Sequence, residues 1–197
     1  MNGDSAGALD ELLSQAADAL RKARHVCALT GAGISAESGI PTFRDALTGL
    51  WANFNPEDLA TPEAFERDPK FVWDWYEFRR ELIRHAEPNP GHFALTELAG
   101  RVPRFTLVTQ NVDGLHARAG SRNVIELHGN IMVDRWFAEG CVLTPADEIP
   151  GTPPRCARCG APVRPGVVWF GEALPPEALE NALVATKRCE VFLSIGT

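Results

Sequence analysis

The chain lacks an excess of positive charge, a long apolar run and an N-terminal leader pattern. Its 197 residues carry 19 Lys and Arg against 26 Asp and Glu, which gives a formal net charge of -7. This acidic balance argues against a general surface for nucleic acids or anionic membranes. No apolar run approaches the length of a membrane span, and the polar N-terminus lacks the pattern of a signal peptide. We therefore expect no nucleic-acid partner and no membrane partner.

Cysteine is scarce and does not fit a disulfide framework. The five cysteines are an odd number, and two of them form a C-x-x-C pair. This usage is typical of a reducing compartment, so we expect a cytoplasmic protein. The length suffices for one domain with a sizeable core and a small insertion.

Short apolar runs alternate with helical patterns along the chain. Strand-like runs cover 26–29, 105–109, 124–127, 167–170 and 191–195, and helical patterns cover 8–24, 71–85, 92–99 and 178–187. This alternation predicts an α/β fold with a parallel sheet. Residues 130–165 are proline-rich with little periodicity, and we expect a small inserted module there.

A glycine turn follows the first strand-like run. Gly31, Gly33 and Ala36 fit the G-x-G-x-x-G/A pattern of a dinucleotide-binding loop. Small residues there let backbone N–H groups approach a pyrophosphate, and a helix that follows adds its positive end. The glycine pattern alone has many chance matches.

Polar residues follow the second and third strand-like runs. The second ends in Gln110-Asn111-Val112-Asp113, which an Asx turn explains equally well. The third ends in His128 before Gly129, at the edge where such sheets bind ligands. A histidine placed there can take a proton from a hydroxyl at neutral pH.

Tyr76 and Arg79 are three residues apart in a predicted helix and so share one face. A guanidinium can hold a carboxylate in a two-pronged pair, and a phenol can add one hydrogen bond. The simpler alternative is an amphipathic helix with an exposed arginine.

The stretch from Gly31 through Ile40-Pro41-Thr42-Phe43-Arg44 resembles the sirtuin family, as do Thr109 to Asp113 and Glu126 to Gly129. The resemblance runs from about residue 20 onward, with the motifs in the family's order. It implies a Rossmann-type parallel sheet in a domain over 1–197, with a small zinc-ribbon-like insertion at about 130–165. Sirtuins continue past a similar Gly-Thr-Ser, so we expect a domain that is incomplete at its C-terminus.

The resemblance implies an NAD-dependent protein lysine deacylase. In that family the acyl-lysine carbonyl oxygen attacks the ribose carbon as nicotinamide leaves, and O-acyl-ADP-ribose is formed. NAD is thus a consumed co-substrate. The implied catalytic residues are His128, as general base, and Asn111. The implied NAD contacts are Gly31, Ala32, Gly33, Ala36, Phe43, Arg44, Gln110, Asn111, Asp113, Gly196 and Thr197.

The substrate implied by the resemblance is an acylated lysine side chain of a protein. Tyr76-x-x-Arg79 resembles the class III sirtuins, whose preferred acyl groups end in a carboxylate, so desuccinylation or demalonylation is the expected preference. Val168 and Gly171 lie in a stretch that resembles the segment pairing with the substrate backbone. A plain core strand is the alternative for that stretch.

A metal site stays open between two interpretations. Cys156-x-x-Cys159 is half of a zinc knuckle, and Cys141 lies nearby in sequence. Zinc-binding sirtuins have an earlier cysteine pair where this chain has Trp136 and Glu139. Either the three thiolates bind zinc, or packing of Trp136 replaces the metal in a vestigial knuckle.

Three functions follow from these patterns. The first is a deacylase that prefers acidic acyl groups. The second is a module that binds NAD or acyl-lysine without turnover. The third is a Rossmann oxidoreductase, which the lack of a ribose-binding acid after the second strand disfavours.

Overall fold

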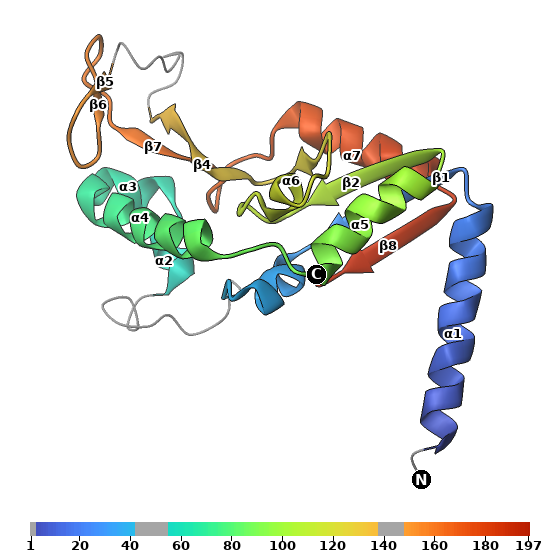
Figure 1. Ribbon diagram of the computed structural model, residues 1–197. Helices are drawn as coiled ribbons and strands as arrows, with labels where there is room; N and C mark the ends of the chain where they lie inside the picture. The colour runs from blue at the N-terminus through green and yellow to red at the C-terminus, as the bar shows by residue number, and fades with distance from the viewer. Residues whose placement is uncertain (1–2, 42–54, 138–147) are drawn as a thin grey trace.

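A four-stranded parallel sheet forms the centre of the fold (Figure 1). The computed structural model describes residues 3–41, 55–137 and 148–197. The strands run in the order β3-β2-β1-β8, and every neighbouring pair is parallel. Their bounds are β1 His25–Thr30, β2 Arg104–Thr109, β3 Ile125–Glu126 and β8 Val191–Ile195. The predicted parallel α/β fold is confirmed.

Helices α5 (Pro90–Arg101) and α7 (Pro176–Arg188) cover opposite faces of this sheet. Cys27 of β1 packs with Ala182 and Ala185 of α7. The next residue, Ala28, packs with Leu95 of α5. Because successive side chains of a strand point to opposite faces, the two helices lie on the two sides. A sheet covered on both faces explains the nearly continuous apolar runs of its strands.

A second core lies beside the sheet, between a helical layer and an antiparallel strand pair (Figure 1). The helices are α2 (Pro56–Leu59), α3 (Pro62–Arg67) and α4 (Pro69–His85), and β4 (Gly129–Trp136) pairs with β7 (Val163–Val167). Large aromatic side chains fill it. Trp75 and Tyr76 of α4 are buried with Phe65 of α3 and with Trp169.

Arg80 joins α4 to β4 in this second core. Its Nε donates to the Ile131 carbonyl at 2.6 Å, and its Nη2 donates to Asp134 Oδ1 at 2.5 Å. The guanidinium also lies over the Trp73 ring, 5.1 Å from its centroid. These contacts keep a buried charge hydrogen-bonded, as a charged group in a core requires.

Shorter elements complete the chain. They are α1 (Gly3–Lys22), the 3-10 helix η1 (Ala32–Ser38), α6 (Leu115–Arg118), β5 (Glu148–Ile149) and β6 (Arg155–Cys156). Helix α1 extends away from the sheet (Figure 1), and its Leu9, Leu12 and Leu13 are more than half exposed. Among the described helices, none is long and apolar enough to cross a bilayer.

Two local predictions are wrong. The strand expected at 167–170 lies instead at Val163–Val167, because the next N–H groups leave the ladder. Val168 donates to the carbonyl of His128, and Phe170 donates to the carbonyl of Ala60. The helix expected after the glycine turn is the short 3-10 helix η1 rather than an α-helix.

We expect Arg80→Met to lower the free energy of unfolding by about 2–3 kcal/mol, because it leaves the Ile131 carbonyl and the Asp134 carboxylate without their donor. The matched control is Arg84→Met, one turn later on α4. Its ion pairs are exposed, so its loss should stay below about 1 kcal/mol. Urea unfolding measures both, and equal losses would show that Arg80 does not join the two elements.

Candidate functional site

The glycine turn packs against the end of β8 at close range. Gly31 N–H donates to the Ile195 carbonyl at 3.0 Å, and Gly33 N–H donates to the Gly196 carbonyl at 2.9 Å. A Cβ added to Gly33 would lie 2.8 Å from Gly196 Cα, closer than such atoms normally approach. Glycine is therefore required here for close backbone packing, and the turn and Gly196 lie together as the sequence predicted.

The loop after β2 is bonded to the same turn. Asn111 is buried, and its Nδ2 donates to the Gly31 carbonyl at 3.0 Å and to Ser35 Oγ at 3.2 Å. Ser35 Oγ donates in turn to Asp113 Oδ2 at 2.8 Å. Because both amide hydrogens of Asn111 are used, its Oδ1 is left as an acceptor for a further group.

A buried histidine, His116, lies next to this network. His116 Nε2 is 2.9 Å from Thr30 Oγ1, which itself donates to Thr109 Oγ1. His116 Nε2 must therefore be the donor, and its Nδ1 is buried with no hydrogen-bond partner among the described residues. Burial, with a smaller contribution from nearby His92, lowers the pKa of His116 to about 4. The hydrogen bond to Thr30 therefore joins the loop after β2 to β1 rather than closing a local turn.

His92 connects helix α5 to the glycine turn. Its Nδ1 accepts from the Asn89 N–H at 3.3 Å in a capping box at the start of the helix. Its Nε2 is 3.5 Å from Ser35 Oγ, and its ring lies 4.8 Å from that of His116. Burial lowers the pKa of His92 as well. Two neutral imidazoles therefore pack next to each other beside Thr30 and Ser35, at the edge of the polar cluster.

His128 lies half-buried just after β3, beside the loop that follows β2. Its Nδ1 is 2.8 Å from the Gln110 carbonyl oxygen. A carbonyl can only accept, so Nδ1 carries the proton and Nε2 carries the lone pair. Gln110 N–H donates to the Thr30 carbonyl at 2.9 Å, which places this pair beside the end of β1. The geometry gives His128 the tautomer that a general base needs.

Tyr76 and Arg79 lie on one face of α4, as predicted. Tyr76 is 2% exposed, and its hydroxyl oxygen accepts from Trp169 Nε1 at 2.8 Å, so its own hydrogen remains available to donate. The Arg79 guanidinium lies over the Trp75 ring, 4.9 Å from its centroid. Burial lowers the pKa of Arg79, and the charge of Asp113 acts in the opposite direction. Because Arg79 is partly exposed, its cation is only partly shielded from water, and it lies within the electrostatic reach of Tyr76 and Asp113.

The other predicted site residues differ in exposure, and some lie outside the described residues. Ala32 is partly exposed, whereas Ala36, Gly171 and the terminal Thr197 are exposed. Gly171 has a left-handed φ of 85° in the turn that follows Val168. Phe43, Arg44 and Cys141 lie outside the described residues.

The described cysteines do not form a metal site. Cys156 is buried in an apolar cluster with Trp73, Trp136 and Val163, whereas Cys159 is exposed. No group of three His, Cys, Asp or Glu within the described ranges could hold a metal ion. Because Cys141 lies outside the described residues, both interpretations of the knuckle stand as predictions, and we assign no chemical step to zinc.

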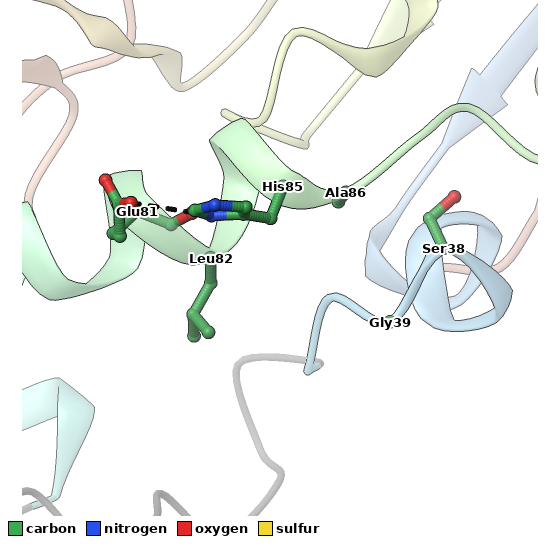
Figure 2. Close-up of a pocket in the computed structure, with 6 residues that line it drawn as sticks. All are labelled: Ser38, Gly39, Glu81, Leu82, His85 and Ala86. Atoms are coloured by element: carbon green, nitrogen blue, oxygen red, sulfur yellow. Dashed lines mark hydrogen bonds and ion pairs between the residues drawn. The ribbon is translucent and has the colours of Figure 1, made fainter.

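A separate hollow of about 320 Å³ opens between the C-terminal end of α4 and the end of η1 (Figure 2). The described residues that line it are Ser38, Gly39, Glu81, Leu82, His85 and Ala86. Its ion pair, between Glu81 and His85, is solvent-exposed on both sides. The polar cluster at the strand ends includes the buried Asn111 and Asp113 and lies at the edge where α/β sheets bind ligands, so it is the stronger candidate site.

Known proteins are similar to this chain over most of its length. The model of the Sir2 family matches residues 31–197. An NAD-dependent protein deacylase of Ralstonia nicotianae is 57% identical over 93% of this chain and 74% of its own length. An NAD-dependent protein deacylase of Aquifex aeolicus is 55% identical over 88% of this chain and 72% of its own length.

Solved structures agree with these relatives. A Sir2 homologue in complex with NAD is 46% identical, with a TM-score of 0.80 over 93% of this chain and 72% of that one. A Sir2 complex with a p53 peptide and NAD+ is 32% identical, with a TM-score of 0.78 over 93% of this chain and 75% of that one.

The buried imidazole of His116 should make stability depend on pH. The pKa of His116 is about 4 in the folded protein and 6.5 in the unfolded chain, so between these pH values the unfolded chain binds more protons. Stability from this group is therefore present above pH 6.5 and lost as the pH falls toward 4, by roughly 3 kcal/mol. The ring of His92 packs against it, and burial lowers the pKa of His92 as well.

The measurement is urea unfolding from pH 7.5 to 4 for the wild type, His116→Gln and the control His85→Gln, whose side chain is exposed. The curve of His116→Gln should be flatter than the wild-type curve, and that of His85→Gln should follow the wild type. Parallel curves for all three proteins would contradict a neutral, buried His116.

Proposed function

This chain belongs to the Sir2 family and is an NAD-dependent protein deacylase, and we propose that it prefers lysines whose acyl groups end in a carboxylate. The observation that supports the site most strongly is the tautomer of His128. A base with a free Nε2 lies at the same sheet edge as the glycine turn and Asn111. In open α/β sheets, ligands bind at this edge.

The described residues fit NAD as the co-substrate. When bound, NAD supplies a ribose carbon open to attack and nicotinamide as the leaving group. Gly31 and Gly33 hold the glycine turn against the end of β8, and in this proposal the pyrophosphate lies at that turn. Asn111 offers Oδ1 as an acceptor for an amide or a hydroxyl, and His128 Nε2 takes the proton of a ribose hydroxyl.

Arg79 and Tyr76 supply the preference for acidic acyl groups in this proposal. A partly buried guanidinium gains from a carboxylate partner, because partial desolvation strengthens a charge-assisted hydrogen bond. The Tyr76 hydroxyl can donate a second bond to the same carboxylate. In this proposal, the segment that holds Val168 and Gly171 binds the backbone of the acylated peptide.

The test is incubation with NAD and matched succinyl-, malonyl- and acetyl-lysine peptides, followed by mass spectrometry. Release of nicotinamide with deacylated peptide supports the proposal. Binding of NAD or peptide without products would support the binding module instead. Formation of NADH would point to an oxidoreductase, and either result overturns deacylation by this chain.

We expect His128→Ala to lower kcat by about 10²–10⁴-fold, because a positioned general base contributes that much. His128 is half-buried, and its ring makes one hydrogen bond to the described residues, so the fold should persist and circular dichroism should be unchanged. His85→Ala, on the exposed end of α4, is the control and should keep its activity. A loss smaller than tenfold in His128→Ala would exclude it as the base.

We expect Arg79→Met to reduce kcat/KM for the succinyl peptide by about 10–100-fold, the worth of a charged hydrogen bond. Activity on the acetyl peptide should change far less, since methionine keeps the apolar contact with Trp75. Arg84→Met is the control on the same helix. Tyr76→Phe is a poorer test, because it also leaves the Trp169 indole without its acceptor. Equal losses on both peptides would rule out acid recognition by Arg79.

A further inference from the structure

A buried ion pair connects β7 to the turn that follows it. Arg164 Nη1 donates to Glu172 Oε1 at 2.5 Å, and Nη2 donates to Glu172 Oε2 at 3.0 Å. The Arg164 side chain is 3% exposed, and its guanidinium carbon lies 3.2 Å from the centroid of the Trp169 ring. Nη2 also donates to the Val167 carbonyl at 2.8 Å. The arginine therefore contacts both ends of the segment 167–172.

Glu172 closes this segment into a turn. Its Oε2 accepts from the Trp169 backbone N–H at 2.8 Å, and its own N–H donates to the Trp169 carbonyl at 3.0 Å. Burial raises the pKa of Glu172, but the bonds from Arg164 and from the Trp169 backbone outweigh burial and hold it below its ordinary value. The carboxylate is thus charged and fully engaged at neutral pH.

The turn contacts or contains three groups that the proposed function uses. Val168 N–H donates to the carbonyl of His128 at 2.9 Å. Trp169 Nε1 donates to the hydroxyl of Tyr76 at 2.8 Å. The exposed residues of the turn, Phe170 and Gly171, include part of the stretch assigned to the substrate backbone. One turn therefore contacts the proposed base, the proposed acyl selector and the proposed peptide-binding stretch.

Stability alone does not account for a buried ion pair here. An apolar pair of similar volume often stabilises a core as well or better, so we interpret this pair as a means of fixing one geometry. We propose that Arg164 and Glu172 are positioning residues that set the 168–171 segment for acylated peptide. This inference rests on the proposed function, since the segment matters only if a peptide binds there.

The test compares Glu172→Gln with the wild type. The amide keeps the shape but loses the charge, so we expect KM for the acylated peptide to rise about tenfold or more, the equivalent of one charged hydrogen bond. The values of kcat and of KM for NAD should stay within about threefold, because neither the glycine turn nor the His128 ring contacts Glu172. A fluorescent acyl-lysine peptide, followed by anisotropy, should show the same loss of binding.

Arg135→Met is the matched control. Arg135 reaches the same carboxylate at 3.1 Å, but its side chain is 48% exposed. Exposed pairs contribute little, so its KM for peptide should change less than about twofold. Hydrogen exchange of the Trp169 backbone N–H, measured by NMR, should be faster in Glu172→Gln and unchanged in Arg135→Met.

The outcomes separate the two proposals. If the wild type binds peptide but forms no products, deacylation by this chain fails, and the anisotropy comparison still tests the positioning role. If the KM values for peptide and NAD change together with kcat and thermal stability, the pair is merely structural and the inference is overturned. An unchanged peptide KM with faster exchange at Trp169 also overturns it, as does a wild type that binds no acylated peptide.

Discussion

The candidate site depends on how closely the backbone of the glycine turn approaches Gly196. Hydrogen bonds from Gly31 and Gly33 to the end of β8 leave no room for a Cβ, and Asn111 fastens the loop after β2 to the same turn. The ends of three parallel strands, β1, β2 and β8, are thereby held at one edge. A bulkier residue in the turn would push these loops apart and separate the groups that the chemistry requires.

Hydrogen-bond direction decides which atoms remain available for a ligand. Ser35 receives a hydrogen from Asn111 and gives its own to Asp113, so these groups are engaged with one another. The Gln110 carbonyl fixes the proton of His128 on Nδ1. What remains open is an amide oxygen and an imidazole nitrogen, which are both acceptors. A ribose with hydroxyl donors complements that pair.

Local sequence patterns predicted the central sheet and the motifs at its edge, but not the long-range contacts. The apolar runs gave β1, β2 and β8, and the motif spacing placed the glycine turn, Asn111 and His128 at one edge. The pairing of β4 with β7 was missed because a register shift, Pro165 and Gly166 break the alternation. The partner of His116 is 86 positions away, and the bond from Trp169 to Tyr76 spans 93, so neither leaves a local signal. Ser35 lies inside the glycine-turn stretch from Gly31 to Arg44, yet only the fold shows that it binds Asn111 and Asp113.

The most direct test of a single pocket at the sheet edge is an NMR titration of the backbone amides with NAD. The account predicts that the signals of 31–35, 110–113 and 128 shift together, with one common Kd. It also predicts that residues lining the separate hollow, such as Glu81 and His85, stay unchanged. Shifts confined to that hollow, or different Kd values for the glycine turn and His128, would contradict it.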